Sequence, residues 1–382
     1  MRGAVPGDRV RVQLGRVKKR FARGTVLEVL DAPHRVEPLC PHLDHCGGCP
    51  WQRIPVETQR EALTTHLART LSQAAGRPVT PAPLHGPAET TAWRSTARVH
   101  WARGRLGFYG PGGKDVADID HCPVFEPAVA TLYGEVRSHL LPHLPGTGTL
   151  RLSAAPGAAS GTLSIRLPAE RRATVKAIAH FVEGTEACHG AVVQQGSERH
   201  IFGAAENIFG AADVPHPAES FVQAHQAGNH ALGQEVVERL SDARSVIELY
   251  AGSGNLSLAL AAAGVSVTAV EIDPAAVEAL NRAAAARNLT AHLRAIAGDA
   301  GQWPAGDYDA ALIDPPRSGA GPALEGLCCT TVTRLLYVSC DAATLGRDVR
   351  QLVARGWRVE HARAFDLFPH TGHVEALVEL RR

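Results

Sequence analysis

The segment Ser245-Val-Ile-Glu-Leu-Tyr250-Ala-Gly-Ser-Gly-Asn255 is the most diagnostic part of this chain. Its apolar run predicts a buried strand, and its two glycines predict a tight turn that lets the backbone approach a ligand closely. A helix is expected over residues 256–263, and Val265-Ser-Val-Thr-Ala-Val270 predicts a second buried strand. This order of strand, turn, helix and strand is typical of an α/β protein with a parallel sheet.

The same unit predicts a nucleoside site. Glu271 follows Gly252 by 19 positions, and a carboxylate at the tip of the second strand can accept hydrogen bonds from both ribose hydroxyls. The turn lacks the third glycine that a pyrophosphate requires, so a single nucleoside fits better, and S-adenosylmethionine is the usual one. Further along the sheet, we expect Asp299 near the adenine amino group and Asp314 near the methionine end.

Two further apolar runs end in reactive groups. Leu335-Leu-Tyr-Val-Ser-Cys340 ends in a thiol and Ala310-Ala-Leu-Ile-Asp314 ends in a carboxylate, whereas a third run begins at Glu375. Taken singly, such a cysteine is more often an inert core residue, and Asp-Pro-Pro can simply end a strand. Together at one sheet edge, a thiol nucleophile, a carboxylate and a candidate base predict covalent catalysis.

The residue that follows Asp314-Pro-Pro is Arg317. Amino-group methyltransferases have an aromatic residue there to stack a flipped base, so the arginine favours carbon as the methyl acceptor. Uracil is a methyl acceptor of this kind. Its C5 becomes nucleophilic only after a thiolate adds to C6, and a base must then remove the C5 proton. These requirements predict Cys340 as the nucleophile and Glu375 as the base.

Taken together, these segments resemble the RNA uracil-5-methyltransferase family, in its iron–sulfur-containing branch. The matching segments, in the family's order, are Phe221-Val-Gln223, Glu248-Leu-Tyr-Ala-Gly-Ser-Gly-Asn255, Glu271, Asp314-Pro-Pro-Arg-Ser-Gly319, Val338-Ser-Cys340 with Ala343-Thr-Leu-Gly-Arg-Asp348, and Phe368-Pro-His-Thr-Gly-His-Val-Glu375. The resemblance implies a class I, Rossmann-like methyltransferase domain in which Cys340 is the nucleophile and Glu375 the proton acceptor. It also implies an S-adenosylmethionine site formed by Gln223, Tyr250, Asn255, Glu271, Asp299 and Asp314.

Three positions depart from the family's pattern. Asp341-Ala342 stands where the family usually has Asn-Pro, His225 replaces an asparagine, and Ala251 replaces a frequent cysteine. None of these changes removes a reacting group. A carboxylate at Asp341, directly beside the thiol, is expected to raise the pKa of Cys340.

A second cluster of motifs predicts a metal centre. Cys40, Cys46 and Cys49 form a C-x5-C-x2-C pattern, and Cys122 is a candidate fourth ligand. Spacing alone does not separate zinc from an iron–sulfur cluster, and a disulfide is a further alternative, although nothing marks the chain as secreted. The iron–sulfur branch of the family has this spacing with a remote fourth cysteine. The resemblance therefore implies a structural [4Fe–4S] cluster.

Length and composition are those of a globular protein with two or three domains. The chain has 382 residues, of which 45% are hydrophobic and 20% are charged, and no apolar run is long enough to span a bilayer. We expect a cytoplasmic monomer without a membrane partner. The predicted divisions are a basic, partly TRAM-like β segment over 1–38, an iron–sulfur loop and central β-rich, α+β RNA-binding domain over 39–214, and the S-adenosylmethionine-dependent methyltransferase domain over 215–382.

The charge distribution suggests a nucleic-acid partner. Residues 1–39 contain nine Lys or Arg and four Asp or Glu, so a basic hairpin here either follows a phosphate backbone or is simply a solvated surface. In the family, this position often carries a small RNA-binding barrel known as TRAM, and residues 1–38 resemble its C-terminal part. A second candidate RNA surface comprises Trp93, Arg94, Arg98 and Trp101, although packing is the alternative role for both tryptophans.

The resemblance implies C5-methylation of uridine in RNA, with the target base flipped out of a loop. We favour 23S ribosomal RNA because the iron–sulfur branch mostly modifies large-subunit ribosomal RNA, whereas the tRNA-specific branch lacks the cluster. The alternatives are a tRNA uracil-5-methyltransferase, an amino-methyltransferase acting on a base or a protein, and a non-catalytic RNA-binding protein. Arg317 and Cys340 argue against the amino-methyltransferase, and Cys340 with Glu375 argues against the non-catalytic protein.

Overall fold

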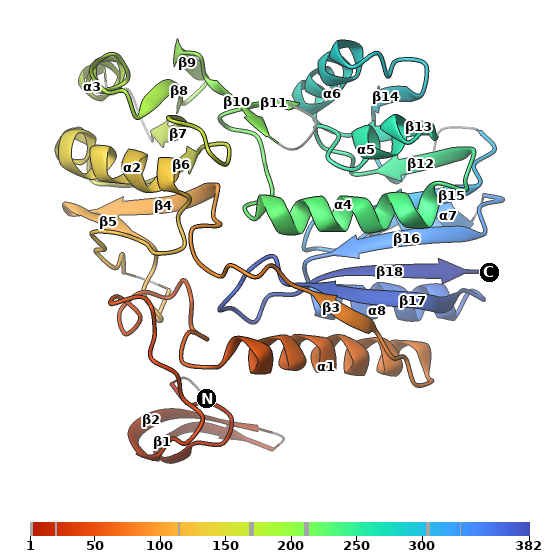
Figure 1. The fold of residues 1–382 in the computed structure, drawn as a ribbon, viewed down its shortest axis with the longest axis horizontal. Coiled ribbons are helices and arrows are strands. Elements are labelled where there is room, and N and C mark those ends of the chain that lie inside the picture. The colour runs from red at the N-terminus through yellow and green to blue at the C-terminus, as the bar shows by residue number, and fades with distance from the viewer. Residues whose placement is uncertain are drawn as a thin grey trace.

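The computed structural model describes residues 3–19, 21–113, 115–167, 172–209, 214–302, 306–328 and 330–382. An N-terminal hairpin projects from the body of the molecule, a central β-rich domain follows, and an α/β domain contains the C-terminus (Figure 1). The predicted combination of an α/β domain with a β-rich α+β domain is confirmed.

An eight-stranded sheet forms the centre of the α/β domain, in the order β14-β13-β12-β15-β16-β18-β17-β3. Five neighbouring strands run parallel, namely β14 (Leu293–Ala297), β13 (Ser266–Glu271), β12 (Ser245–Leu249), β15 (Ala310–Ile313) and β16 (Arg334–Ser339). Strand β18 (Glu375–Arg381) runs antiparallel between β16 and β17 (Arg358–Phe365), and β3 (Ala82–His85) pairs with β17.

Helices cover both faces of this sheet (Figure 1). One face packs against α1 (Val56–Ala75), α7 (Pro322–Cys328) and α8 (Ala342–Val353). The other packs against α4 (Gln226–Leu240), α5 (Ser257–Ala262) and α6 (Pro274–Ala286). Successive strand residues alternate between the two cores, so Val246 belongs to one and Ile247 to the other. Both cores are large because a central parallel sheet is buried on its two faces.

Residues 56–85 belong with this sheet, although the sequence boundary assigned them to the central domain over 39–214. Leu63, Leu67 and Leu71 recur every four residues along α1 and are buried in the core below the α/β sheet. Strand β3 extends the sheet beyond β17. The predicted boundary therefore has to be corrected, because an apolar stripe indicates that a helix is buried but not which sheet buries it.

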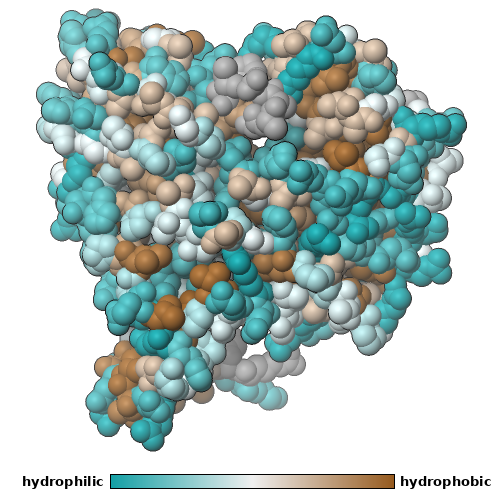
Figure 2. Space-filling view, viewed as in Figure 1, coloured by the Kyte–Doolittle hydropathy of each residue, from teal (hydrophilic) through white to brown (hydrophobic). Residues whose placement is uncertain are grey.

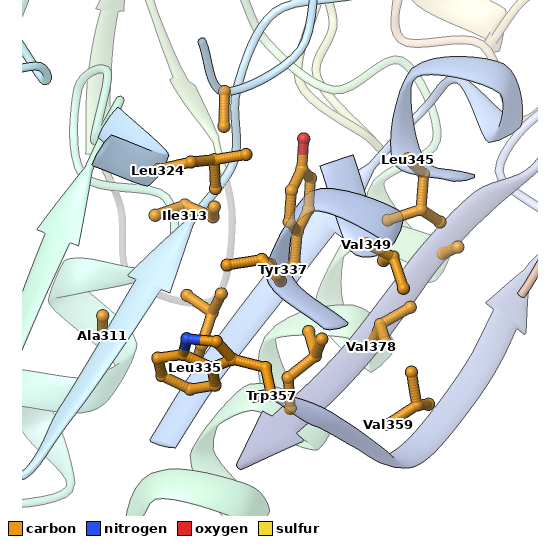
Figure 3. Close-up of a cluster of buried hydrophobic side chains, with 14 of the residues drawn as sticks. Ala311, Ile313, Leu324, Leu335, Tyr337, Leu345, Val349, Trp357, Val359 and Val378 are labelled. Carbon is orange, nitrogen blue, oxygen red and sulfur yellow. The ribbon is translucent and has the colours of Figure 1, made fainter. Parts of the chain in front are cut away.

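A buried carboxylate fixes the loop that follows β15. Asp348 on α8 accepts a hydrogen bond from the Tyr337 hydroxyl at 2.7 Å and another from the backbone N–H of Ala320 at 2.9 Å. The Tyr250 hydroxyl donates to the carbonyl of the same Ala320 at 2.7 Å. Tyr337 reaches this position through the apolar cluster drawn in Figure 3. The loop that carries Asp314 is therefore tied to α8, to β16 and to the glycine turn.

The central domain is a six-stranded sheet in the order β5-β4-β6-β7-β8-β9. Its strands are β4 (Thr96–Ala102), β5 (Arg105–Gly107), β6 (Thr147–Ser153), β7 (Gly161–Leu167), β8 (Cys188–Gln195) and β9 (Glu198–Gly203). One face packs against α2 (Pro127–Glu135), α3 (Arg172–Gly184) and the short turns η1 (Val136–Leu140) and η2 (Leu141–His143). A hairpin of β10 (Glu206–Phe209) and β11 (Val214–Pro217) leads toward the α/β domain. Trp93 and Trp101 are buried, so their packing role is confirmed.

The N-terminal segment is a two-stranded antiparallel ribbon of β1 (Arg9–Lys18) and β2 (Phe21–Asp31). Within the described residues it pairs with no further strand, so it is a hairpin and not a closed barrel. Apolar side chains such as Leu14, Val17 and Leu27 are exposed on it, and the projecting hairpin carries brown patches in Figure 2. None of the described helices has both the length and the apolar character needed to cross a bilayer.

Candidate active site and cysteine site

A cleft of about 2510 Å³ lies at the carboxyl edge of the eight-stranded sheet, where the α/β domain meets the central domain. The chain's predicted reactive and cofactor-binding residues converge on it from segments that are far apart in the sequence. Those that line the cleft are Gln223, Tyr250, Asn255, Glu271, Asp314, Cys340 and Glu375.

Strand topology explains why Cys340 and Glu375 are neighbours. Because β18 runs antiparallel to β16, its first residue lies at the edge where β16 ends. Ser339, the last residue of β16, pairs with Ala376. Cys340 directly follows Ser339, and Glu375 directly precedes Ala376. The antiparallel register alone therefore places the thiol beside the carboxylate.

The glycine turn after β12 has the backbone that its sequence predicts. Gly252 and Gly254 have φ of +56° and +95°, and Tyr250 has φ of 63°. A Cβ at Gly254 would lie 2.1 Å from Leu280 Cδ1, so Leu280 would have to move, and the φ of +95° would strain any other residue there. The Glu271 carboxylate accepts a hydrogen bond from the Gly252 N–H at 2.9 Å. The turn and the acidic strand end therefore form one unit, as expected for a nucleoside site.

Asn255 and Asp299 differ in their placement. Asn255 exchanges two side-chain hydrogen bonds with Asn229, at 2.7 and 2.8 Å, on the wall of the cleft. Asp299 is not among the residues that line the cleft, and its carboxylate accepts a hydrogen bond from the Gly301 N–H at 2.8 Å. It lies close enough to Tyr250 to raise the pKa of that phenol, after the larger effect of burial.

Three ionisable groups surround the Cys340 thiol. Burial, the charge of Glu375 and the charge of Asp314 raise the pKa of Cys340, whereas a hydrogen bond from Arg317 lowers it. Burial also raises the pKa of Asp314 and of Glu375, and their mutual repulsion adds to the shift at Glu375. Two buried carboxyl groups that repel each other favour holding one proton between them.

Asp341 is not among the main charges that act on the Cys340 thiol. The Asp341 carboxylate caps α8 by accepting a hydrogen bond from the Thr344 N–H at 2.8 Å, which lowers the pKa of Asp341. The main charges that raise the pKa of Cys340 are those of Glu375 and Asp314. Asp341, which replaces the family's usual asparagine, therefore stabilises the N-terminus of α8, where a carboxylate is favourable.

A buried glutamine holds the loop that leads into Glu375. Gln59 on α1 accepts a hydrogen bond from the His370 N–H at 3.0 Å and donates to the carbonyls of Trp51 and Ile54 at 3.1 and 2.7 Å. The Trp51 N–H in turn donates to the His370 carbonyl at 2.9 Å. Trp51, which directly follows the cysteine loop, and Gln59 therefore hold His370, in the loop that precedes the candidate base Glu375.

The four predicted cysteine ligands converge on a second, smaller pocket of about 260 Å³. Cys40, Cys46, Cys49 and Cys122 all line it, together with Arg94. Burial raises the pKa of all four thiols, and the charge of the neighbouring guanidinium lowers it at three of them. The Arg94 Nε is buried and has no hydrogen-bond partner among the described residues. A basic group with an unused donor facing several thiols fits an anionic occupant.

The two pockets share part of their walls. Arg317 and Phe368 line both the large cleft and the cysteine pocket. Phe368 also packs against Cys49 and Cys122 in a small apolar cluster. The cysteine site therefore lies directly behind the loop that carries the candidate base.

Sequence reasoning missed Gln59 and placed Arg94 wrongly. Gln59 precedes Leu63, Leu67 and Leu71 at four-residue spacing, so a polar residue on a buried stripe is the signal that could have identified it. Arg94 was grouped with a possible RNA surface, but it faces the cysteines. No local pattern separates these two roles, because the neighbouring cysteines lie far away in the sequence.

We expect Arg317→Gln to shift the titration of Cys340 to higher pH. Arg317 lowers the pKa of the thiol, so its removal raises that pKa and reduces the thiolate fraction at any fixed pH below it. The check is the rate of Cys340 alkylation by iodoacetamide against pH, followed by mass spectrometry of the peptide. Arg350→Gln, on the exposed side of α8, is the matched control. Superimposable profiles for Arg317→Gln and the native protein would contradict this account.

Comparison with known proteins places this site in a family. Residues 305–382 match the family model for tRNA (uracil-5-)-methyltransferase, and residues 246–314 match a methyltransferase domain. The chain is 34% identical to the 23S rRNA (uracil(1939)-C(5))-methyltransferase RlmD of Chromohalobacter salexigens, over 99% of this chain and 83% of that protein. It is 31% identical to RlmD of Salmonella paratyphi A, over 100% of this chain and 90% of that protein.

A solved structure has the same fold. The Pyrococcus abyssi tRNA (uracil-54, C5)-methyltransferase, in complex with S-adenosyl-L-homocysteine, superposes with a TM-score of 0.77. The match covers 99% of this chain and 94% of that one at 20% identity, and so it supports the fold alone. Together with the identity to the two RlmD proteins, these findings show that the chain belongs to the RNA uracil-C5-methyltransferase family.

Proposed function

We propose that the protein transfers a methyl group from S-adenosylmethionine to C5 of a uridine in RNA, with 23S ribosomal RNA as the substrate. One observation supports this most strongly. Glu375 Oε2 is buried and has no hydrogen-bond partner among the described residues, and it belongs to the wall of the cleft that also holds Cys340. A buried, unpaired carboxylate oxygen is energetically costly, so it is best explained by a partner that arrives with the substrate.

In the proposed mechanism, the Cys340 thiolate forms a bond to C6 of uracil and the displaced electron pair moves onto the O4 enolate. S-adenosylmethionine would supply the methyl group: as the enolate collapses, C5 bonds to the methyl carbon, the methyl–sulfonium bond breaks, and S-adenosylhomocysteine leaves with that electron pair. Glu375 then removes the C5 proton, and the returning electron pair expels Cys340 from C6. These steps restore the C5–C6 double bond of uracil and the free thiolate.

The charges around the site suit these steps. Arg317 favours the ionised forms of both Cys340 and Glu375, which are the forms that react. Burial raises the pKa of Asp314 to about 7 and also raises the pKa of Glu375, so the two carboxyl groups favour sharing one proton, while Arg317 opposes the shift at Glu375. We assign Asp314 to the methionine end of the methyl donor, where it faces the reacting groups.

The remaining cofactor contacts are assigned from placement. Glu271 would accept hydrogen bonds from the ribose hydroxyls, because it lies at the tip of β13 beside the glycine turn. Gln223, Tyr250 and Asn255 line the same part of the cleft. The assignment of Asp299 to the adenine edge is kept as a prediction, and it requires the ligand to reach beyond the cleft lining.

The choice of RNA follows from the relatives. The RlmD proteins act on 23S rRNA according to their names, and they are 34% and 31% identical to this chain, whereas the tRNA enzyme of P. abyssi is 20% identical. The alternative substrate is therefore tRNA. We place the protein in the cytoplasm with its RNA substrate, and propose that it acts as a monomer.

We further propose that Cys40, Cys46, Cys49 and Cys122 hold a [4Fe–4S] cluster. All four cysteines line one pocket, and the unpaired Nε of Arg94, which faces them, favours an anionic occupant. The C-x5-C-x2-C spacing with a remote fourth cysteine resembles that of the family's iron–sulfur branch, which favours the cluster over zinc.

Covalent trapping tests the proposed reaction. The native protein, incubated with S-adenosylmethionine and 23S ribosomal RNA fragments that contain 5-fluorouridine, should form an RNA complex that survives denaturation. Fluorine cannot leave as a cation, so the elimination of Cys340 stalls after methyl transfer. Cys340→Ala should form no complex, whereas Cys188→Ala, which changes a buried cysteine of the central domain, should form it normally.

The other outcomes decide between the alternatives. A complex with Cys340→Ala would mean that another residue is the nucleophile. A complex with tRNA but with no fragment of 23S ribosomal RNA would move the substrate to the tRNA class. Methyl transfer without any trapped complex would support the amino-methyltransferase alternative.

The cluster has its own test. Protein purified without air should be brown, absorb broadly in the visible blue and contain about four iron atoms per chain. Cys122→Ala should lose both the colour and the iron, while Cys188→Ala should keep them. A colourless protein with one zinc ion per chain would contradict the assignment.

A further inference from the structure

Among the described residues, no helix packs against the second face of the six-stranded sheet. Helices α2 and α3 pack against the opposite face, and the β10–β11 segment covers the open face only near Val192, which is buried with Ala205 and Ala218. The rest of this open face carries mainly polar side chains. Among them, Arg98 on β4 and Arg166 on β7 are exposed.

Strand register sorts these side chains into two rows across the sheet. One row runs through Arg98, Arg151, Ser164, Val192 and Ile201. The next row runs through His100, Thr149, Arg166, Gln194 and Arg199. Since neighbouring strands are about 4.8 Å apart, each row spans roughly 19 Å from β4 to β9. Four arginines therefore lie on one continuous surface.

The positive charge of this surface is only partly neutralised. Arg98 lies beside Arg151, and burial and then the charge of Arg98 lower the pKa of Arg151. Arg199 is paired with Glu219. Arg98 and Arg166 have no ion pair among the described residues. Arg98 and Arg166, two separated arginines without an acidic partner on one face, favour an anion of repeating charge over an isolated carboxylate.

The surface continues into the cleft. Arg151 donates hydrogen bonds to the carbonyls of Glu219, at 3.1 Å, and Ser220. Arg199 and Ile201 of the last strand line the cleft itself, as does Phe221, whose exposed fraction is 72%. The sheet face and the cleft that contains Cys340 therefore meet at Arg199 and Ile201.

An aromatic pair lies near the far end of the surface. The Tyr109 ring stacks on the His100 ring, with centroids 4.0 Å apart, and Tyr109 is 44% exposed. Exposed aromatic rings beside arginines are what an unstacked base can pack against.

We propose that this open face, defined by Arg98, Arg151, Arg166, Arg199 and Tyr109, binds the single-stranded RNA that flanks the target uridine. The proposal rests on the proposed function, because it names where the RNA substrate of that same cleft lies. Arg98 and Arg166 hold phosphates, Arg151 and Arg199 add positive charge to the face, and Tyr109 packs against a base, so that the flanking strand enters the cleft past Arg199. The face is too polar for a protein partner, since Ile201 is its one large exposed apolar side chain among the described strand residues.

Binding measurements test the proposal with chemistry switched off. In a Cys340→Ala background, the affinity for a fluorescently labelled single-stranded fragment of 23S ribosomal RNA is measured by anisotropy at several salt concentrations. Arg98→Ala with Arg166→Ala should weaken binding about 10-fold at 100 mM salt. The slope of log affinity against log salt should fall by about 1.4, from two lost phosphate contacts on a single strand.

The matched control is Arg355→Ala with Arg358→Ala, which removes the same charge from the exposed far end of the α/β domain. It should leave the affinity within about 2-fold, and both double variants should bind S-adenosylmethionine like the parent in calorimetry. Equal losses in both double variants, or none in the Arg98 and Arg166 variant, would overturn the proposal.

This outcome is separable from that of the proposed function. A native protein that forms the 5-fluorouridine complex, combined with unchanged RNA affinity in the double variant, would refute the surface and keep the reaction. Weakened RNA binding without any covalent complex would keep the surface and refute the reaction.

Discussion

One constraint of sheet geometry underlies the site. Parallel strands all end at the same edge, and a single antiparallel strand inserted among them begins at that edge. In this chain β18 is that strand, and its pairing of Ala376 with Ser339 brings Glu375 beside Cys340. A nucleophile and a base on separate loops would have to be ordered by other contacts. Here the backbone hydrogen bonds of the sheet order them.

The electrostatics of the edge follow from the same arrangement. Bringing Asp314, Cys340 and Glu375 together in a buried place raises the pKa of all three. Arg317 on the loop after β15 opposes this by favouring the ionised thiol and glutamate. That loop is in turn tied down by Asp348, and the loop before Glu375 is tied down by Gln59. The clamp at Gln59 includes Trp51, which directly follows the cysteine loop. A cluster held by that loop would therefore support the position of Glu375 structurally, without any electron transfer.

Much of the site could be predicted from the sequence because its signals are local. The glycine turn, the acidic end of β13 and the thiol at the end of β16 are each encoded within a few residues. The contacts of α1 and β3 with the α/β sheet could not be predicted, because an apolar stripe does not name its partner. Arg94 illustrates the same limit. Its neighbours Cys46 and Cys122 come from opposite sides of it in the sequence, and only the folded chain brings them together.

The account depends on Glu375 acting as the base opposite Cys340, and one substitution tests this directly. Glu375→Gln is incubated with S-adenosylmethionine and ordinary uridine-containing 23S ribosomal RNA, with the exposed Glu360→Gln as control. Because an amide cannot accept the C5 proton, methylated RNA should remain bonded to Cys340 and accumulate as a denaturation-resistant complex, while the control releases its product. Free methylated RNA formed by Glu375→Gln at the native rate would show that another group takes the proton.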